Sequence, residues 1–124
     1  MEIIHTNQAP EAIGPYSQAI VAGELIFTSG QIPIDPATGT VEAQSIEAQT
    51  EQVMKNLQAV LKAAGSDLAK AVKTTCFLSS MDDFAAFNEI YARYFTGKPA
   101  RSCVAVKTLP KNVKVEVEVI AVRG

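Results

Sequence analysis

The sequence predicts one soluble α+β domain in which a mixed sheet carries two helices on one face. Its 124 residues suit a single domain with one hydrophobic core, so we treat residues 1–124 as that domain. Hydrophobic residues make up 48% of the chain and charged residues 19%, which is a globular composition. Residue patterns predict, in chain order, three strands, a helix, a strand, a helix and two strands.

Three strands are expected in the first third of the chain. Glu2 to Thr6 has the pattern of a short strand, and residues 7–15 have the Pro and Gly content of a loop. Ser17 to Ala22 and Leu25 to Ser29 are rich in β-formers, and Gly23-Glu24 between them is typical of a tight hairpin. A second loop then runs from Gly30 past Gly39.

The clearest helix is expected from Ser45 to Ala64. Ser45 can cap its start, and Gly65 can adopt the left-handed conformation at its end. Ala48 stands where a capping box would need Glu, so that motif is incomplete. Apolar residues recur at steps of three and four on one face: Ile46, Val53, Leu57, Val60, Leu61 and Ala64.

A strand and a second helix follow. Ala71 to Leu78 alternates, which predicts Val72, Thr74, Cys76 and Leu78 on one side of a strand. Asp82 or Asp83 is expected to open the helix, which Gly97 and Pro99 end. We interpret its aromatic stripe as packing against the sheet: Phe84, Phe87, Tyr91, Tyr94 and Phe95.

The last two strands are expected at Arg101 to Lys107 and Val113 to Val122, joined as an antiparallel pair. Val115, Val117, Val119 and Ala121 point to one side of the final strand, while Glu116, Glu118 and Ile120 point to the other. In the partner strand, either Arg101, Cys103 and Ala105 or Ser102, Val104 and Val106 share a given face.

Two helices cover one face of such a sheet and leave the other bare. That bare face is too apolar to stay in water and too charged for a simple core. We therefore expect a homo-oligomer that buries it, with ligand sites near the subunit boundary.

Composition limits the classes of function. A net charge of −2 without a Lys/Arg cluster argues against a nucleic-acid partner or an anionic membrane surface. No apolar run approaches the ~18 residues of a membrane span, and the first residues lack a signal pattern, so we expect a cytoplasmic protein. In that compartment Cys76 and Cys103 should be free thiols. The single histidine, His5, and the absence of metal-ligand spacing give no support for a metal site.

Arg101 is the most informative residue, because it enters a strand from a loop bounded by Pro99 and is therefore fixed in direction. Its planar guanidinium matches a carboxylate with two parallel hydrogen bonds. The alternative is a structural salt bridge to a nearby Glu.

Glu116 lies in the strand expected to pair with that of Arg101, so the two groups are expected to face one cleft. A carboxylate there can orient and deprotonate a water molecule, and desolvation would raise its pKa toward a useful range. The alternatives are an Arg–Glu pair or a solvated Glu, and Glu118 on the same face leaves the assignment open.

Four segments resemble the Rid family, also called YjgF-like proteins, across the whole chain. They are Gly14-Pro15-Tyr16-Ser17-Gln18-Ala19, Phe27-Thr28-Ser29-Gly30-Gln31-Ile32-Pro33, Pro99-Ala100-Arg101-Ser102-Cys103-Val104 and Lys114-Val115-Glu116-Val117-Glu118. The resemblance implies a chorismate-mutase-like fold and a homotrimer, with the sheets as a central barrel and a site in each cleft between subunits. RidA-type members hydrolyse 2-imino acids such as 2-iminobutanoate and 2-iminopropanoate, with their enamine tautomers, to 2-oxo acids and ammonia.

The resemblance also implies roles for seven residues. Arg101 would bind the substrate carboxylate, Glu116 would position water, and Tyr16 would close the pocket with its hydroxyl. Backbone groups of Gly30 and Cys103 would receive the imine nitrogen. Ser29 and Asn88 would line or support the cleft. No cofactor is implied, because the pyridoxal phosphate belongs to the upstream dehydratase, and Cys103 has no histidine partner to make it a nucleophile.

Two other functions compete with this one. Some family members are described as ribonucleases or translation inhibitors, but one histidine, a net negative charge and no basic cluster argue against an RNA-acting protein. A non-catalytic small-carboxylate-binding or chaperone-like protein, with Arg101 as the anchor, stays open.

Overall fold

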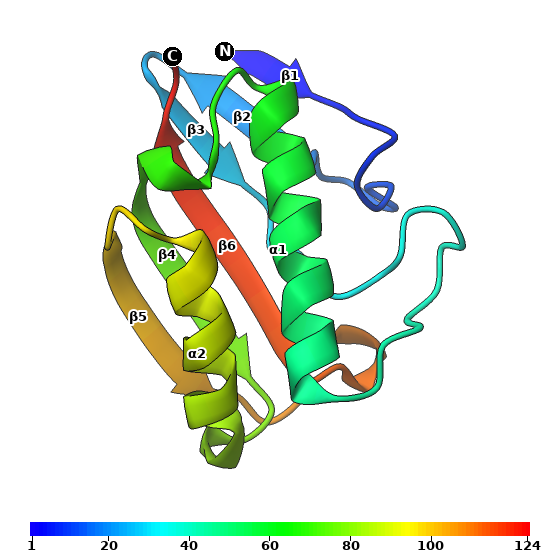
Figure 1. The fold of residues 1–124 in the computed structure, drawn as a ribbon. Coiled ribbons are helices and arrows are strands. Elements are labelled where there is room, and N and C mark those ends of the chain that lie inside the picture. Colours follow the sequence, from blue (N-terminus) through cyan, green and yellow to red (C-terminus); the bar gives the residue numbers. More distant parts are fainter.

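The computed structural model describes residues 1–124 and contains six strands and two α-helices (Figure 1). Their order along the chain is the one that the sequence predicts. The elements are β1 (Glu2–Ile4), β2 (Ala19–Ala22), β3 (Leu25–Thr28), α1 (Ile46–Ala63), β4 (Ala71–Leu78), α2 (Phe84–Tyr94), β5 (Ala100–Ala105) and β6 (Val115–Val122).

The six strands form one sheet in the order β1-β2-β3-β6-β4-β5. All neighbours are antiparallel except β4 and β5, which run parallel. The predicted pairing of β5 with β6 is therefore wrong. The crossover through α2 returns the chain parallel to β4, and β6 has both edges occupied, by β3 and β4.

The predicted ends of α1 are confirmed. Ser45 has an extended backbone, and its Oγ accepts a hydrogen bond of 3.1 Å from the Ala48 backbone N–H. Gly65 follows the helix with φ of 82°. Asp83 stands at the N-cap of α2, which is one of the two predicted positions, but its side chain makes no capping hydrogen bond. A short 3₁₀ turn over Met81–Asp83, capped by Ser80, comes directly before the helix.

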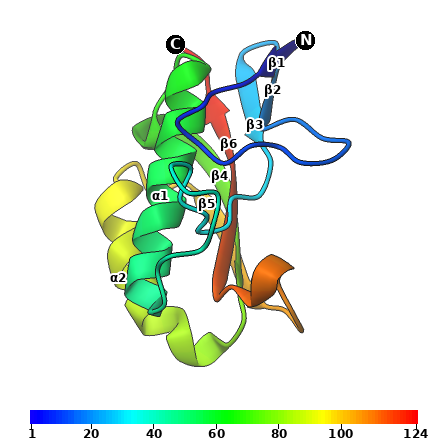
Figure 2. The ribbon, with the colours of Figure 1, turned by 90° about the vertical axis from the view of Figure 1, so that its right-hand side faces the viewer.

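The core lies between the helices and one face of the sheet. Both helices lie on that side in Figure 2, and the inward residues of β6, Val115 to Ala121, are at most 1% exposed. In β4, Thr74, Cys76 and Leu78 are buried as predicted, but Val72 is 44% exposed. A register shift between Ala71 and Lys73 turns Val72 away from the core.

The other face of the sheet carries no helix (Figure 2). Its apolar side chains include Phe27 at 40% and Val104 at 47% exposed, beside Glu116 and Glu118 on β6. The β5–β4 register resolves the alternation left open by the sequence: Arg101, Cys103 and Ala105 face the helix side, and Ser102 and Val104 face the open side. No helix is both long and apolar enough to cross a membrane.

Candidate functional site

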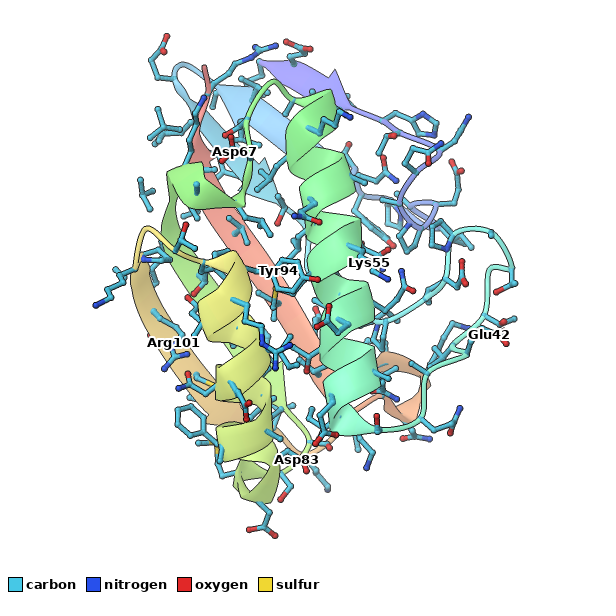
Figure 3. All side chains as sticks on the ribbon, in the orientation of Figure 1. Glu42, Lys55, Asp67, Asp83, Tyr94 and Arg101 are labelled. Atoms are coloured by element: carbon cyan, nitrogen blue, oxygen red, sulfur yellow. The ribbon has the colours of Figure 1, made fainter.

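Arg101 lies in β5, at the edge of the sheet and beside α2 (Figures 1 and 3). Its guanidinium stands over the Tyr91 ring, 4.7 Å from the centroid, and 5.5 Å from the centroid of Phe84. Its Nη1 donates a hydrogen bond of 2.6 Å to Oδ1 of Asn88. Three side chains of α2 therefore fix the direction of this cation.

No carboxylate of the chain pairs with Arg101. The four ion pairs are His5–Glu11, Arg93–Glu51, Arg93–Glu89 and Arg123–Glu2. The structure therefore does not support the alternative of a structural salt bridge within the chain. A pocket of about 450 Å³ opens beside the guanidinium, lined also by Asn88, Tyr91, Phe95 and Lys98. A half-buried, oriented cation at a pocket is suited to binding an anion.

Glu116 lies in a second pocket, of about 340 Å³, on the open side of the sheet. The Gln31 backbone pairs with Val117 through N–H···O contacts of 2.8 and 3.2 Å, which brings Gly30 beside Glu116. A Cβ on Gly30 would lie 2.0 Å from Oε2 of Glu116. The carboxylate thus occupies the space that a side chain at position 30 would need. Tyr16, Ser29 and Pro110 also line this pocket.

The loop that carries Tyr16 is anchored by Gln18, which is 2% exposed. Its side chain accepts from the Thr6 backbone N–H (2.7 Å) and donates to the carbonyls of Thr6 (3.0 Å) and Pro10 (2.8 Å). Ser29 Oγ donates to the Ser17 carbonyl at 2.5 Å. Sequence reasoning missed Gln18 as a structural anchor, because an uncharged polar residue between Ser17 and Ala19 gives no sign in the sequence that it is buried.

The pKa of Glu116 is raised above its ordinary value, first by burial and then by the negative charge of Glu118. The direction is the one expected for a general base that must also return a proton near neutral pH. Its neighbour Glu118 is exposed. The structure therefore distinguishes the two carboxylates that sequence spacing left equivalent.

Arg101 and Glu116 do not face one cleft within the chain, which corrects the sequence prediction. Arg101 is in register with Thr74, and Thr74 with Val119, a core residue on the helix side. Glu116 is three residues from Val119 in the same strand, so it points to the opposite face. The chain gathers Tyr16, Ser29, Gly30 and Glu116 around one pocket, and Asn88 and Arg101 around another.

Cys103 lies on the Arg101 side, in register with Cys76. Both cysteines are free thiols. Burial raises the pKa of both, that of Cys76 to about 12, so they are neutral near pH 7 and poor nucleophiles. The Val106 N–H donates to the Leu78 carbonyl across the strand pair, so by alternation the Cys103 backbone groups point to the free edge of β5.

The model of the family described as Endoribonuclease L-PSP matches residues 6–123. The chain is 50% identical over 121 residues to the chloroplastic Reactive Intermediate Deaminase A of Arabidopsis thaliana. The aligned residues cover 97% of the chain and 65% of that relative. Other relatives of similar identity carry the name RutC family protein.

Two solved structures are closely similar. One is YyfA from Yersinia pestis, described as a protein of unknown function of the conserved Rid protein family, with 51% identity, 98% of each chain covered and a TM-score of 0.95. The other is TdcF from E. coli with bound serine, with 44% identity, full coverage of both chains and a TM-score of 0.94.

Proposed function

Because the chain belongs to the Rid (YjgF-like) family, we propose that it hydrolyses reactive 2-imino acids and their enamine tautomers to 2-oxo acids and ammonia. The observation that carries this proposal is Arg101, an oriented cation at a pocket with no anion of its own chain. The relative named a deaminase and the serine-bound TdcF support a small amino-acid-like ligand. We name 2-iminobutanoate and 2-iminopropanoate as the first substrates to try.

The two pockets carry opposite charge, which suits a 2-iminium carboxylate with one charge of each sign. Arg101 and Lys98 line the first pocket, and Glu11 and Glu116 line the second. A single chain keeps them on opposite faces of its sheet. We therefore propose a homotrimer, in which the open sheet faces meet and each Arg101 pocket joins the Glu116 pocket of a neighbour.

In this site Arg101 binds the substrate carboxylate through its free N–H groups and holds the iminium carbon toward Glu116. Glu116 orients a water molecule and accepts its proton as the oxygen bonds to that carbon. Returning that proton to nitrogen makes ammonia the leaving group. As the carbon–nitrogen bond breaks, Glu116 accepts the hydroxyl proton and the carbon becomes the carbonyl of the 2-oxo acid; the proton then leaves with ammonia as ammonium. The Tyr16 hydroxyl and the backbone groups of Gly30 and Cys103 surround the substrate nitrogen. Ser29 and Asn88 support the walls of the pocket. The iminium carbon is already electrophilic, so orientation supplies most of the acceleration.

The test generates the imine in situ with an amino-acid oxidase or threonine dehydratase and follows imine decay and ammonia release. The intact protein should accelerate hydrolysis, while Arg101→Ala and Glu116→Gln should remove most of the acceleration. No acceleration over buffer with several imino acids would defeat the proposal.

A second candidate, a non-catalytic carboxylate-binding or chaperone-like protein, rests on the same residue, because Arg101 forms no ion pair within the chain. Titration with 2-oxobutanoate, a stable 2-oxo acid, separates the two functions. Binding that requires Arg101 without any imine turnover would favour the binding protein, and turnover would favour the deaminase.

A further inference from the structure

We propose that Tyr91 is a positioning residue for Arg101, holding the guanidinium plane in the orientation that a substrate carboxylate requires. This inference rests on the proposed function and adds a residue to it. The sequence alone places Tyr91 in the aromatic stripe that packs α2 on the sheet, and the structure confirms that packing: Tyr91 is 7% exposed and belongs to the core cluster.

Tyr91 touches two neighbours in the sheet at once. Its hydroxyl hydrogen-bonds with Thr74 Oγ1 at 2.7 Å in a buried position. Its ring face lies under the Arg101 guanidinium, 4.7 Å from centroid to Cζ. Thr74 of β4 is the register partner of Arg101 in β5, so the hydroxyl ties the ring to the strand beside the arginine.

The tilt of the ring is further fixed by Phe95, whose ring stacks on it at 4.5 Å with an interplanar angle of 29°. The ring therefore has little freedom to follow a moving guanidinium. The contact with the ring face is not a hydrogen bond, and the one side-chain hydrogen bond that Arg101 makes is from Nη1 to Asn88. The remaining N–H groups point in fixed directions, as two parallel bonds to a carboxylate require.

The expected effect is on substrate binding rather than on the chemical step, because Tyr91 acts through Arg101. Tyr91→Leu removes the π face, and we expect KM to rise about tenfold with kcat within about threefold of the parent. The Kd for 2-oxobutanoate, measured by calorimetry, should weaken in parallel. Tyr91→Phe keeps the ring, so it should restore KM although it loses the hydrogen bond to Thr74 and some stability.

Phe87→Leu is the matched control. Phe87 is fully buried on the same helix, and its ring centroid lies 5.7 Å from that of Tyr91, but it makes no cation–π contact with Arg101. It should lower Tm as Tyr91→Leu does and leave KM and Kd near the parent values. Equal rises in KM and Kd in both Leu variants, or a Tyr91→Leu variant that lowers kcat alone, would overturn the inference.

If Tyr91→Leu does not fold, pentafluorophenylalanine at position 91 replaces it, compared with Tyr91→Phe. Fluorination reverses the ring quadrupole, so the partial charge of the ring face changes from negative to positive at nearly constant shape. KM and Kd should therefore rise only if that face holds Arg101. Unchanged values would overturn the inference. A parent protein that does not hydrolyse imines would instead defeat the proposed function. The Kd values for 2-oxobutanoate, measured for the parent and the variants, would still decide the role of Tyr91.

Discussion

Gly30→Ala should disable the protein without unfolding it. The added Cβ would lie 2.0 Å from Oε2, 2.9 Å from Cδ and 3.1 Å from Cγ of Glu116, whereas ordinary contacts begin at 3.4 Å. Gly30 does not have a left-handed φ, so alanine fits its backbone. The clash is with a flexible side chain, and the carboxylate must therefore move by more than about 1 Å while the fold remains.

The magnitude follows from what Glu116 does in the proposed mechanism. A displacement of about 1 Å typically costs on the order of 10²-fold in rate, and loss of a general base about 10²- to 10⁴-fold. We expect Gly30→Ala to lower kcat about 100-fold and Glu116→Gln at least as much. Thermal unfolding should give a Tm for Gly30→Ala close to that of the parent.

A double-mutant cycle on imine decay tests whether the loss passes through Glu116. Adding Gly30→Ala to Glu116→Gln should cost less than about threefold more, because the group that the methyl displaces is no longer a base. Full activity of a folded Gly30→Ala variant would refute the reasoning. So would a double variant whose loss of rate equals the product of the losses in the two single variants.

Three other predictions follow from the same geometry. Asn88→Ala removes the acceptor of Arg101 Nη1 and should raise KM about tenfold with little change in kcat, measured by initial rates over substrate concentration. Glu118→Gln removes the negative charge that helps to raise the pKa of Glu116; that pKa should fall, Glu116 should ionise at lower pH, and the acid limb of the pH–rate profile should move to lower pH. An unmoved limb would mean that Glu116 is not the group that titrates. Phe27→Glu places a charge on the open sheet face and should reduce the mass in sedimentation to that of a monomer with loss of activity, whereas Gln58→Glu on the exposed side of α1 should change neither.

Local patterns predicted the elements well, because each depends on residues close in sequence. The three- and four-residue period, Ser45 and Gly65 give α1 nearly to its ends. The alternation of β6 gives its buried face. Val72 was misplaced because the shift in register beside it depends on how β4 meets β6, which alternation within β4 does not encode.

Strand pairing was the less predictable part, because it joins residues far apart in the sequence. Two β-rich runs joined by a turn favour a hairpin, yet β4 lies between β5 and β6. The error also changed the site: with direct pairing, Arg101 and Glu116 can share a face, whereas the observed register places them on opposite faces. The sequence also does not reveal that Gln18 and Tyr91 are buried. For that reason neither residue gave a functional signal in the sequence.

The opposite placement of Arg101 and Glu116 constrains the kind of assembly that can complete the site. In an isologous dimer one shared patch meets its copy, with residue i against j and j against i, so it joins the two pockets only if both lie within one patch, whereas Arg101 and Glu116 lie on opposite faces of the sheet. A heterologous contact joins two different patches, so it can pair the Arg101 pocket of one subunit with the Glu116 pocket of the next although the two lie on different faces. Because every subunit then carries one half of two sites, the ring must close for all sites to be complete, as the proposed trimer does.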